Sequence, residues 1–561
     1  MSSSPSNVPS SHVSKLTWVL RGLVAVLVPV MFFVLVEGAL KLSGYGFPME
    51  ATRPCVVGNK AMVCDNFLFG ARFMPFSMLR TPRPYAFPAE KVAGTYRIVI
   101  IGESAAYGDP DPAYGFSRYL ELMLRRRYPG VNFEVINSSI TATNSYAMLP
   151  IVRDMVSHQA DLFIVYTGSN EVVGPFGAGT VFTSTSLPLP LIRASIWLNS
   201  TSIGQFVNNQ RSLDPKKRQE WRGMEMFLSK QIPWDSPALS GVYSNFEANL
   251  RDSIAVARRG GAQVLLSTVV TNLRDCAPFA SAHRSGLKPD ALKAWEQWNS
   301  RGISLESSGD INGAVQSYQK AAEIDPTYAE LQFRMARCFV ALGDDNDARE
   351  SFQKAREFDA LHFRAGRRIN EVIQRVAQSE QGAQLLDAEA LFAAASPHGV
   401  VGNEFLCDHV HFMPEGNYLL ARAMFDKIST MVPPAVQAKS LGNDVISQEE
   451  CEKLLALTKF DRARLAQENL HRISHPPYTD QLNHEEQVAR LTPLTVNPET
   501  PEETAQQYRF ALQQNPTDTM LHMSYGNFLS RFDREAALNE FRQARPYTDV
   551  PFVLPDGSVL Q

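Results

Sequence analysis

The sequence predicts an α/β fold with a parallel sheet, joined to an all-α repeat region and to one apolar helix at the N-terminus. Three observations predict this arrangement. Short β-branched runs alternate with helical patterns, which is typical of a parallel sheet with helices on both faces. A 34-residue period recurs in the middle of the chain. Roughly 25 nearly uncharged residues lie near the start of the chain, enough to cross a bilayer.

Length and composition exclude several classes of protein. The chain has 561 residues, of which 44% are hydrophobic and 20% charged, so it is neither disordered nor a polytopic membrane protein. Lys and Arg number 54 against 58 Asp and Glu, a net charge of −4, which argues against a nucleic-acid partner. The six cysteines are too few for a disulfide scaffold and lack paired zinc spacing. We expect no cofactor and no metal.

The N-terminal region predicts a membrane anchor. Residues 1–16 are rich in Ser and Pro and are expected to be a disordered tail. Residues 17–42 are long and apolar enough to span a bilayer, with Arg21 reaching the headgroups. A cleaved signal peptide is the alternative, but no clear small-x-small cleavage site follows the apolar core. We expect a single-pass protein with a cytoplasmic N-terminus and an extracytoplasmic catalytic body, although the flanking Lys and Arg are nearly balanced.

Residues 43–92 are expected to be a linker between the anchor and the α/β domain. Cys55 and Cys64 in this segment would close a small loop in an oxidising compartment, and two unrelated thiols are the alternative. Cys276 and Cys407 could likewise form a disulfide, and two buried free thiols are the alternative.

Residues 93–285 are expected to form the first part of the α/β domain. A buried strand at 96–101 ends in Gly-Glu-Ser at 102–104, and a helix follows at 116–127. A serine at the carboxyl end of a parallel strand lies where open α/β sheets bind ligands. An ordinary helix N-cap would have the same local sequence, so the tripeptide alone decides nothing.

Later segments favour a functional serine. Strands at 133–137 and 161–166 each lead into a polar turn, and a further strand at 262–271 ends in Asn272. Far downstream, Asp-His-Val-His at 408–411 opens a helix. Polar clusters that follow parallel strands meet at one edge of the sheet, where a site can be assembled.

In order and position these blocks resemble the SGNH, or GDSL-like, hydrolase family. The matching blocks are Gly-Glu-Ser at 102–104, the small-residue turn at 138–145, Gly-Ser-Asn-Glu at 168–171 and Asp-His-Val-His at 408–411. The resemblance implies a flavodoxin-like parallel sheet and a serine hydrolase that forms an acyl-enzyme.

The resemblance implies a role for each matching residue. Ser104 would be the nucleophile, His411 its general base and Asp408 the group that fixes the imidazole. His409 is the rival base, but the family spacing selects His411. The oxyanion hole would consist of the backbone N–H groups of Ser104 and Ala142 and the side-chain amide of Asn170.

The chain departs from the family pattern at two positions. Ala142 stands where the family usually has Gly, which keeps the backbone donor but restricts φ. Glu171 stands where the family often has Asp, and we expect it to orient a neighbour or to contact the substrate. Asn272 and Arg274, beyond the strand at 262–271, are further candidates for substrate contact. The long excursion at 172–240 is expected to cap the mouth of the site.

Two helical regions resemble tetratricopeptide repeats. In 290–362, Gly309 recurs as Gly343 and Ala314 as Ala348. This region precedes the Asp-His-Val-His block, so it must be inserted into the α/β domain, which resumes at 375–430. A further helical region at 440–561 repeats the spacing with Tyr508 and Ala511, among other residues.

The predicted function is a membrane-anchored SGNH-type serine esterase acting on ester (O-acyl) bonds of a carbohydrate or lipid. An O-acyltransferase using the same Ser-His-Asp site is the alternative. A different class is a repeat scaffold with a vestigial hydrolase domain. The expected partners are an ester or acylated-glycan substrate, a protein bound by the repeats, and the membrane.

Overall fold

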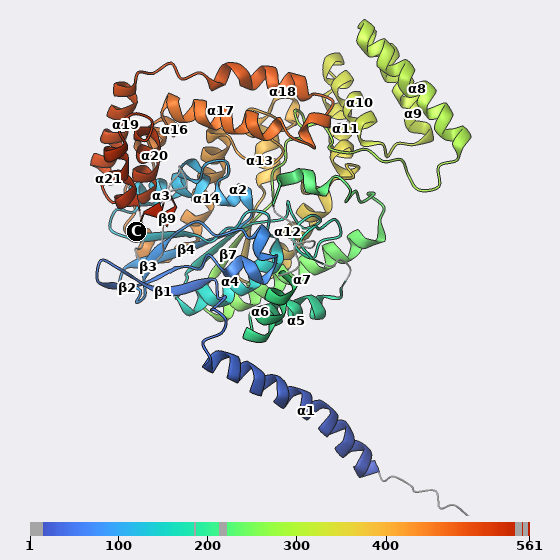
Figure 1. The fold of residues 1–561 in the computed structure, drawn as a ribbon. Coiled ribbons are helices and arrows are strands. Elements are labelled where there is room, and N and C mark those ends of the chain that lie inside the picture. Colours follow the sequence, from blue (N-terminus) through green and yellow to red (C-terminus); the bar gives the residue numbers. More distant parts are fainter. Residues whose placement is uncertain (1–14, 184–186, 213–220, 545–551, 554–558, 561) are drawn as a thin grey trace, which may run out of the picture. The chain divides into compact units, whose positions relative to one another are not determined.

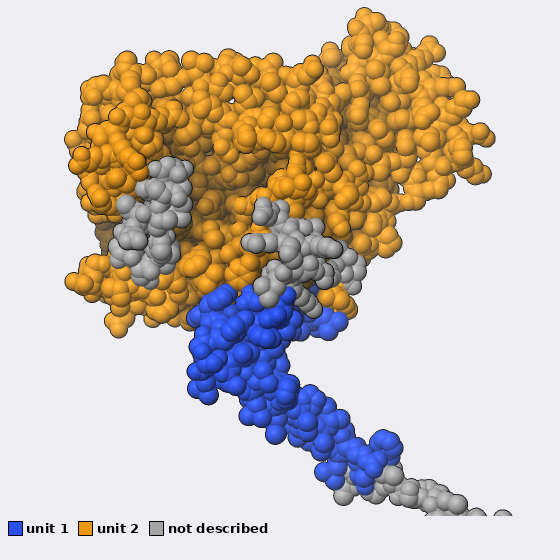
Figure 2. All heavy atoms as spheres, viewed as in Figure 1, with its two compact units in different colours: residues 1–48, 190–218 blue, residues 49–189, 219–561 orange. Residues whose placement is uncertain are grey.

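The computed structural model describes residues 15–183, 187–212, 221–544, 552–553 and 559–560 (Figure 1). It divides into two compact units, which Figure 2 distinguishes by colour. One unit contains residues 1–48 and 190–218, and the other contains residues 49–189 and 219–561. The tail predicted at 1–16 lies almost wholly outside the described residues.

A five-stranded parallel sheet forms the centre of the larger unit, in the order β5-β4-β6-β7-β8. Its central strands are buried on both faces, which explains their uninterrupted runs of Val, Ile, Leu and Phe. The strands are β4 (Thr95–Gly102), β5 (Asn132–Asn137), β6 (Leu162–Tyr166), β7 (Gln263–Ser267) and β8 (Ala383–Leu386).

Two predictions for the sheet need correction. β7 ends at Ser267 rather than at Thr271, because the chain leaves the ladder and enters the loop that supports the site. The edge strand β8 was not predicted, since Ala383–Leu386 is only four residues long and partly exposed.

Helices cover both faces of the sheet, as predicted (Figure 1). α3 packs against α14, whereas α7 packs against α4 and α12. The second part of the α/β domain begins with α12 at Arg367, earlier than the predicted residue 375. The helices are α2 (Ser104–Tyr107), α3 (Phe116–Arg127), α4 (Ser145–Ser157), α7 (Pro237–Arg259), α12 (Arg367–Ser379), α13 (Ala388–Ala395) and α14 (Pro414–Met431).

The segment predicted to be a linker, 43–92, is folded instead. It forms an antiparallel sheet of β1 (Thr52–Val57), β2 (Lys60–Asp65) and β3 (Ala86–Pro88). Gly58 and Asn59 form the β1–β2 turn with φ of 51° and 71°, a conformation that Gly and Asn adopt readily in two-residue hairpins. A disulfide joins Cys55 to Cys64 across the hairpin, whereas Cys276 and Cys407 are free and buried.

The inserted repeat region consists of two helical hairpins between β7 and β8. α8 pairs with α9, and α10 with α11. The repeated positions are core positions, because Ala314, Tyr318 and Ala348 are fully buried. The helices are α8 (Pro289–Ser308), α9 (Ile311–Ile324), α10 (Ala329–Leu342) and α11 (Asp345–Glu357).

The C-terminal region is helical, and its first long helix, α17, packs onto the α/β domain. Arg462 on α17 forms ion pairs with Glu415 on α14 and with Glu452. Tyr508 and Ala511 are fully buried, in agreement with the predicted repeat positions. The elements are α15 (Pro434–Gln437), α16 (Gln448–Leu454), α17 (Lys459–Ile473), α18 (His484–Leu491), α19 (Pro501–Gln514), α20 (Thr519–Leu529), α21 (Arg534–Ala544), β9 (Phe552–Val553) and β10 (Val559–Leu560).

The smaller unit contains α1 (Lys15–Leu42), α5 (Leu189–Asn199) and α6 (Ser202–Ser212). Residues Thr17–Leu42 are long and apolar enough to cross a membrane. A membrane anchor and a signal sequence share these properties. The excursion predicted to cap the site is therefore divided, because residues 190–212 belong with α1 rather than with the α/β domain.

Candidate active site

The predicted nucleophile lies at the carboxyl end of β4. Ser104 starts the short helix α2 directly after Gly102 and Glu103. The strand has to end on glycine here, because a Cβ at Gly102 would lie 2.2 Å from the carbonyl oxygen of Tyr166. The tight exit turns the Ser104 side chain toward the loop before α14, where its Oγ lies 2.7 Å from Nε2 of His411.

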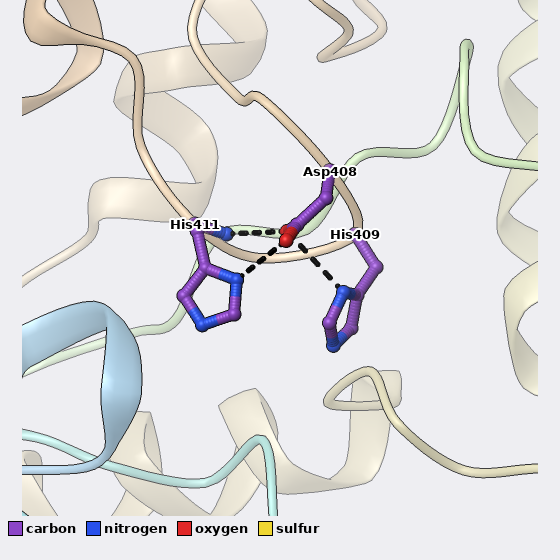
Figure 3. Close-up of side chains that lie close together, drawn as sticks. All are labelled: Asp408, His409 and His411. Carbon is purple, nitrogen blue, oxygen red and sulfur yellow. Dashed lines mark hydrogen bonds and ion pairs between the residues drawn. The ribbon is translucent and has the colours of Figure 1, made fainter. Parts of the chain in front are cut away.

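The loop before α14 holds the other two residues of the predicted triad. Nδ1 of His411 lies 2.6 Å from Oδ2 of Asp408, and the backbone N–H groups of Val410 and His411 both donate to Oδ1 at 3.0 Å (Figure 3). Burial alone would raise the pKa of Asp408, but the neighbouring His411 and His409 hold it well below its usual range. The structure thus brings Ser104, His411 and Asp408 into one hydrogen-bonded chain.

His409, the rival base, has a different environment. It is buried, with Nδ1 3.2 Å from Oδ1 of Asp408 and 2.7 Å from the hydroxyl of Tyr478. Burial lowers the pKa of His409. Asp408, His409 and His411 also form a cluster with the spacing of metal ligands in the described part of the chain. Both ring nitrogens of His411 are already engaged, so a metal ion would have to displace Ser104 or Asp408.

The three residues predicted to form the oxyanion hole, Ser104, Ala142 and Asn170, line one cavity together with His411. Ala142 and Asn170 lie on the turns after β5 and β6. Among the described residues, the backbone N–H groups of Ser104 and Ala142 donate to no backbone carbonyl. Ala142 has a φ of 57°, the left-handed conformation that costs a residue with a Cβ about 1–2 kcal/mol. The departure from glycine at this position therefore carries backbone strain.

Glu103, next to the nucleophile, fixes the turn that carries Asn170. Its buried carboxylate accepts hydrogen bonds from the Thr167 hydroxyl at 2.9 Å and from the backbone N–H groups of residues 168–170 at 2.9–3.1 Å. Burial raises the pKa of Glu103 to about 7, against the opposing effect of these bonds. Glu103 therefore couples the end of β4 to the end of β6, between the nucleophile and the predicted amide donor.

Glu171, Asn272 and Arg274, predicted to contact substrate, do not line this cavity. Glu171 is buried and accepts hydrogen bonds from the backbone N–H and the hydroxyl of Ser145 at 2.8 and 2.9 Å. Asn272 donates to the Asp408 carbonyl at 3.1 Å, and Arg274 forms ion pairs with acidic neighbours. The polar atoms of all three are used inside the protein. Substrate contact is therefore corrected to a supporting position for Asn272 and Arg274, whereas Glu171 orients a neighbour, as the other expectation for it stated. Burial and the nearby Glu103 raise the pKa of Glu171 to about 8.

Arg472, which α17 brings into the site, was not predicted from the sequence. Its Nη1 donates to Oδ2 of Asp408 at 2.8 Å, and its Nη2 donates to both carboxylate oxygens of Asp109 at 3.0 and 3.1 Å. Asp109 in turn lies 3.3 Å from Nε2 of His411. Arg472 therefore connects the predicted triad to a second carboxylate, and no local motif on α17 could have revealed this contact.

The cavity has a volume of about 700 Å³ and two kinds of wall. Aromatic and aliphatic side chains form one part of the wall and come from the capping excursion and from Phe363, directly after the repeat region. Charged or polar side chains form the other part. The guanidinium of Arg80 lies 4.3 Å above the ring of Trp221, where the two parts meet. The apolar members are Val173, Phe182, Trp221, Met224, Phe227 and Phe363, and the charged or polar members include Arg80, Asp109, Glu468, His471, Arg472 and His475.

Comparison with protein families identifies one part of the chain. Residues 305–366 match the family model described as tetratricopeptide repeat. These residues are tetratricopeptide repeats. The match confirms the predicted insert over this range. No curated protein matches the sequence.

Solved structures similar to this chain include two esterases and a lipase. An acetyl xylan esterase is 12% identical with a TM-score of 0.27, and the match covers 59% of this chain and 99% of that one. An acetylxylan esterase from Geobacillus stearothermophilus has the same identity, TM-score and coverage of this chain, and 94% of its own length is matched. A GDSL-like lipase from Bacteroides thetaiotaomicron is 10% identical with a TM-score of 0.24, and the match covers 61% and 93% of the two chains.

Proposed function

We propose that this protein is a membrane-anchored serine esterase that cleaves O-acyl esters through an acyl-enzyme. The observation that carries the proposal is the unbroken chain from Ser104 through His411 to Asp408, with distances of 2.7 and 2.6 Å. A serine hydroxyl is a weak nucleophile unless a base lies within hydrogen-bond reach, and a buried carboxylate must orient that base.

The proposed reaction has two halves. His411 accepts the proton of Ser104 as Oγ attacks the ester carbonyl, and the imidazolium then protonates the departing alcohol. Water attacks the resulting acyl-Ser104 by the same route in reverse. In both halves the negative charge on the carbonyl oxygen would be stabilised by the N–H groups of Ser104 and Ala142 and by the Asn170 amide.

The substrate class follows from the proposed chemistry and the cavity. Its volume of about 700 Å³ accommodates more than a simple acetate ester, and its mixed apolar and charged lining suits an acylated carbohydrate or a lipid ester. We propose that the repeats bind a protein partner, since such repeats form surfaces rather than catalytic sites.

Covalent labelling tests the proposed enzyme. A fluorophosphonate probe should label the wild type, and Ser104→Ala should abolish labelling and lower hydrolysis of p-nitrophenyl acetate by roughly 10³-fold or more. Ser157→Ala, an exposed serine on α4, is the matched control and should retain both activities. Labelling that persists in Ser104→Ala would refute the assignment of the nucleophile. If the acyl group is transferred to an added oligosaccharide rather than to water, the proposed function changes from esterase to acyltransferase.

The proposed location places α1 in the membrane and the catalytic body outside the cytoplasm. The Cys55–Cys64 disulfide supports this orientation, because disulfides persist in oxidising compartments. Protein isolated under an alkylating quench should keep both cysteines unmodified until a reductant is added. Alkylation of Cys55 and Cys64 without reductant would contradict the orientation.

A further inference from the structure

The hairpin of α5 and α6 packs along the carboxyl-terminal half of α1. The ring of Trp197 stacks on Phe33 with centroids 5.8 Å apart, and Phe206 meets Tyr45 edge-on at 5.7 Å. The first contact places the turn end of α5 against α1, and the second places the middle of α6 against the segment just beyond the end of α1. The hairpin and α1 belong to the same compact unit (Figure 2).

A partly buried polar contact fixes the hairpin at a defined height on α1. Glu37, an acidic residue inside the apolar span, accepts hydrogen bonds from the backbone N–H groups of Ser202 and Ile203, each at 3.0 Å. These N–H groups open α6 and have no partner within their own helix. The carboxylate and the start of α6 thus satisfy each other, which gives a reason for an acidic residue in this helix.

The position of Phe33 determines how deep the hairpin reaches. Phe33 lies nine residues before Leu42, the end of the apolar span, which corresponds to about 14 Å along a helix. The hydrocarbon core of a bilayer is about 30 Å thick. When α1 crosses a membrane, Trp197 beside Phe33 must therefore lie at the depth of the lipid acyl chains.

Several polar groups at the turn of the hairpin are paired within the protein. The hydroxyls of Ser200 and Thr201 donate to the carbonyls of Trp197 and Leu198 at 2.6 and 2.7 Å. The side chain of Asn208 donates to that of Asn199 at 3.1 Å, and the backbone N–H of Ser200 and Thr201 close the turn at 3.0 and 2.9 Å. Backbone and side-chain polar groups at membrane depth must be paired internally in this way.

Much of the outer surface of the hairpin is apolar, although Asn209 and Gln210 on α6 are also exposed. Between residues 189 and 210 Arg193 is the one charged residue in the sequence. Five large apolar side chains are exposed by 39–57% of their surface: Leu191, Trp197, Leu198, Phe206 and Val207. A patch of this kind beside a membrane-spanning helix needs a hydrophobic neighbour.

We propose that the α5–α6 hairpin is a membrane-embedded element, whose exposed apolar side chains are covered by lipid acyl chains in the leaflet that holds the carboxyl-terminal half of α1. This inference rests on the proposed membrane anchoring of α1. Lipid is the occupant because the patch is continuous with the span, follows it to hydrocarbon depth and carries almost no charge. The protein is therefore held by three helices rather than by one.

Site-specific fluorescence in vesicles tests the hairpin. Trp197→Cys and Phe206→Cys are each labelled with an environment-sensitive nitrobenzoxadiazole dye in the full-length protein, which is reconstituted in phosphatidylcholine vesicles. The free native cysteines are buried and should react slowly. Lys60→Cys, on the exposed β1–β2 turn, is the control. Dye at 197 should emit at shorter wavelength and lose most of its intensity when the lipids carry acyl-chain nitroxides. Dye at 206, beside Tyr45 just beyond the span, should be quenched less, and dye at 60 should be unaffected.

Carbonate extraction and the intact mass separate this inference from the proposed anchoring. Protein that resists extraction and retains α1, yet shows no nitroxide quenching at 197 or 206, would overturn the embedded hairpin and leave the anchor intact. The same holds if these dyes are shielded from aqueous iodide without nitroxide quenching, since protein rather than lipid would then cover the patch. Protein that is extracted, or that lacks α1 by mass, would overturn both.

Discussion

Removal of Arg472 should impair catalysis although the side chain lies outside the predicted triad. In Arg472→Met, Asp408 and Asp109 lose their shared cation. Asp109, 3.3 Å from Nε2 of His411, then competes with Ser104 for that nitrogen, which lies 2.7 Å from the serine hydroxyl. A hydrogen bond to a charged group contributes about 1.5–3 kcal/mol. Loss of that amount in the transition state corresponds to a fall in kcat/KM of about 10- to 150-fold.

A double variant gives the prediction a second readout. In Arg472→Met/Asp109→Asn the competing carboxylate is absent, and part of the lost activity should return, with a coupling energy of about 1–3 kcal/mol.

A matched control lies on the same helix. Arg462→Met removes ion pairs with Glu415 and Glu452 and leaves the triad untouched, so its kcat/KM should stay within about twofold of the wild type, since such partly exposed pairs contribute little. Thermal unfolding of all variants checks that the fold survives. The reasoning is refuted if Arg472→Met keeps wild-type kcat/KM, or if the double variant loses activity additively.

Two further predictions concern strain and protonation. Ala142→Gly should raise the free energy of unfolding by about 1 kcal/mol, because glycine adopts a φ of 57° without a Cβ clash. Chemical denaturation measures this free energy, and a less stable variant would contradict the strain at Ala142. The pKa of Glu171 is about 8 in the folded protein and 4.5 in the unfolded chain, so the folded state binds this proton more tightly. The stabilising contribution is complete below about pH 4.5 and is lost as the pH rises from there to about 8. The free energy of unfolding of Glu171→Gln should therefore rise relative to that of the wild type between pH 5 and pH 8, by up to about 1.4 kcal/mol per pH unit. A difference between the two proteins that does not change with pH would contradict the burial of an uncharged Glu171.

The parts of the site that sequence could predict are those fixed by short local blocks. Ser104 follows a strand of continuous apolar, β-branched composition, and Asp408 and His411 share one loop. These local blocks are enough to locate the proposed triad. The positive φ of Ala142 could not be inferred, because a residue with a Cβ normally argues against it. The supporting roles of Asn272 and Arg274 depend on which way each side chain turns after β7, and the sequence pattern does not specify this.

Long-range contacts account for most of what was missed. Arg472 lies 363 residues from Asp109, on a helix whose pattern indicates only an amphipathic surface. The antiparallel sheet at 52–88 escaped prediction because Pro54 interrupts β1 and β3 is only three residues long. The Gly58-Asn59 turn and the two nearby cysteines were the available signals, and together they describe the hairpin that the structure contains.

The participation of α17 in the site has a consequence for the timing of synthesis. The nucleophile is made early and Arg472 comes 368 residues later, a gap of roughly 20–70 s at ordinary translation rates of about 5–20 residues per second. A nascent chain that already exposes Ser104 therefore lacks His411, Asp408 and Arg472 for most of its synthesis. Until Asp408 and His411 have been synthesised, the proposed triad cannot form.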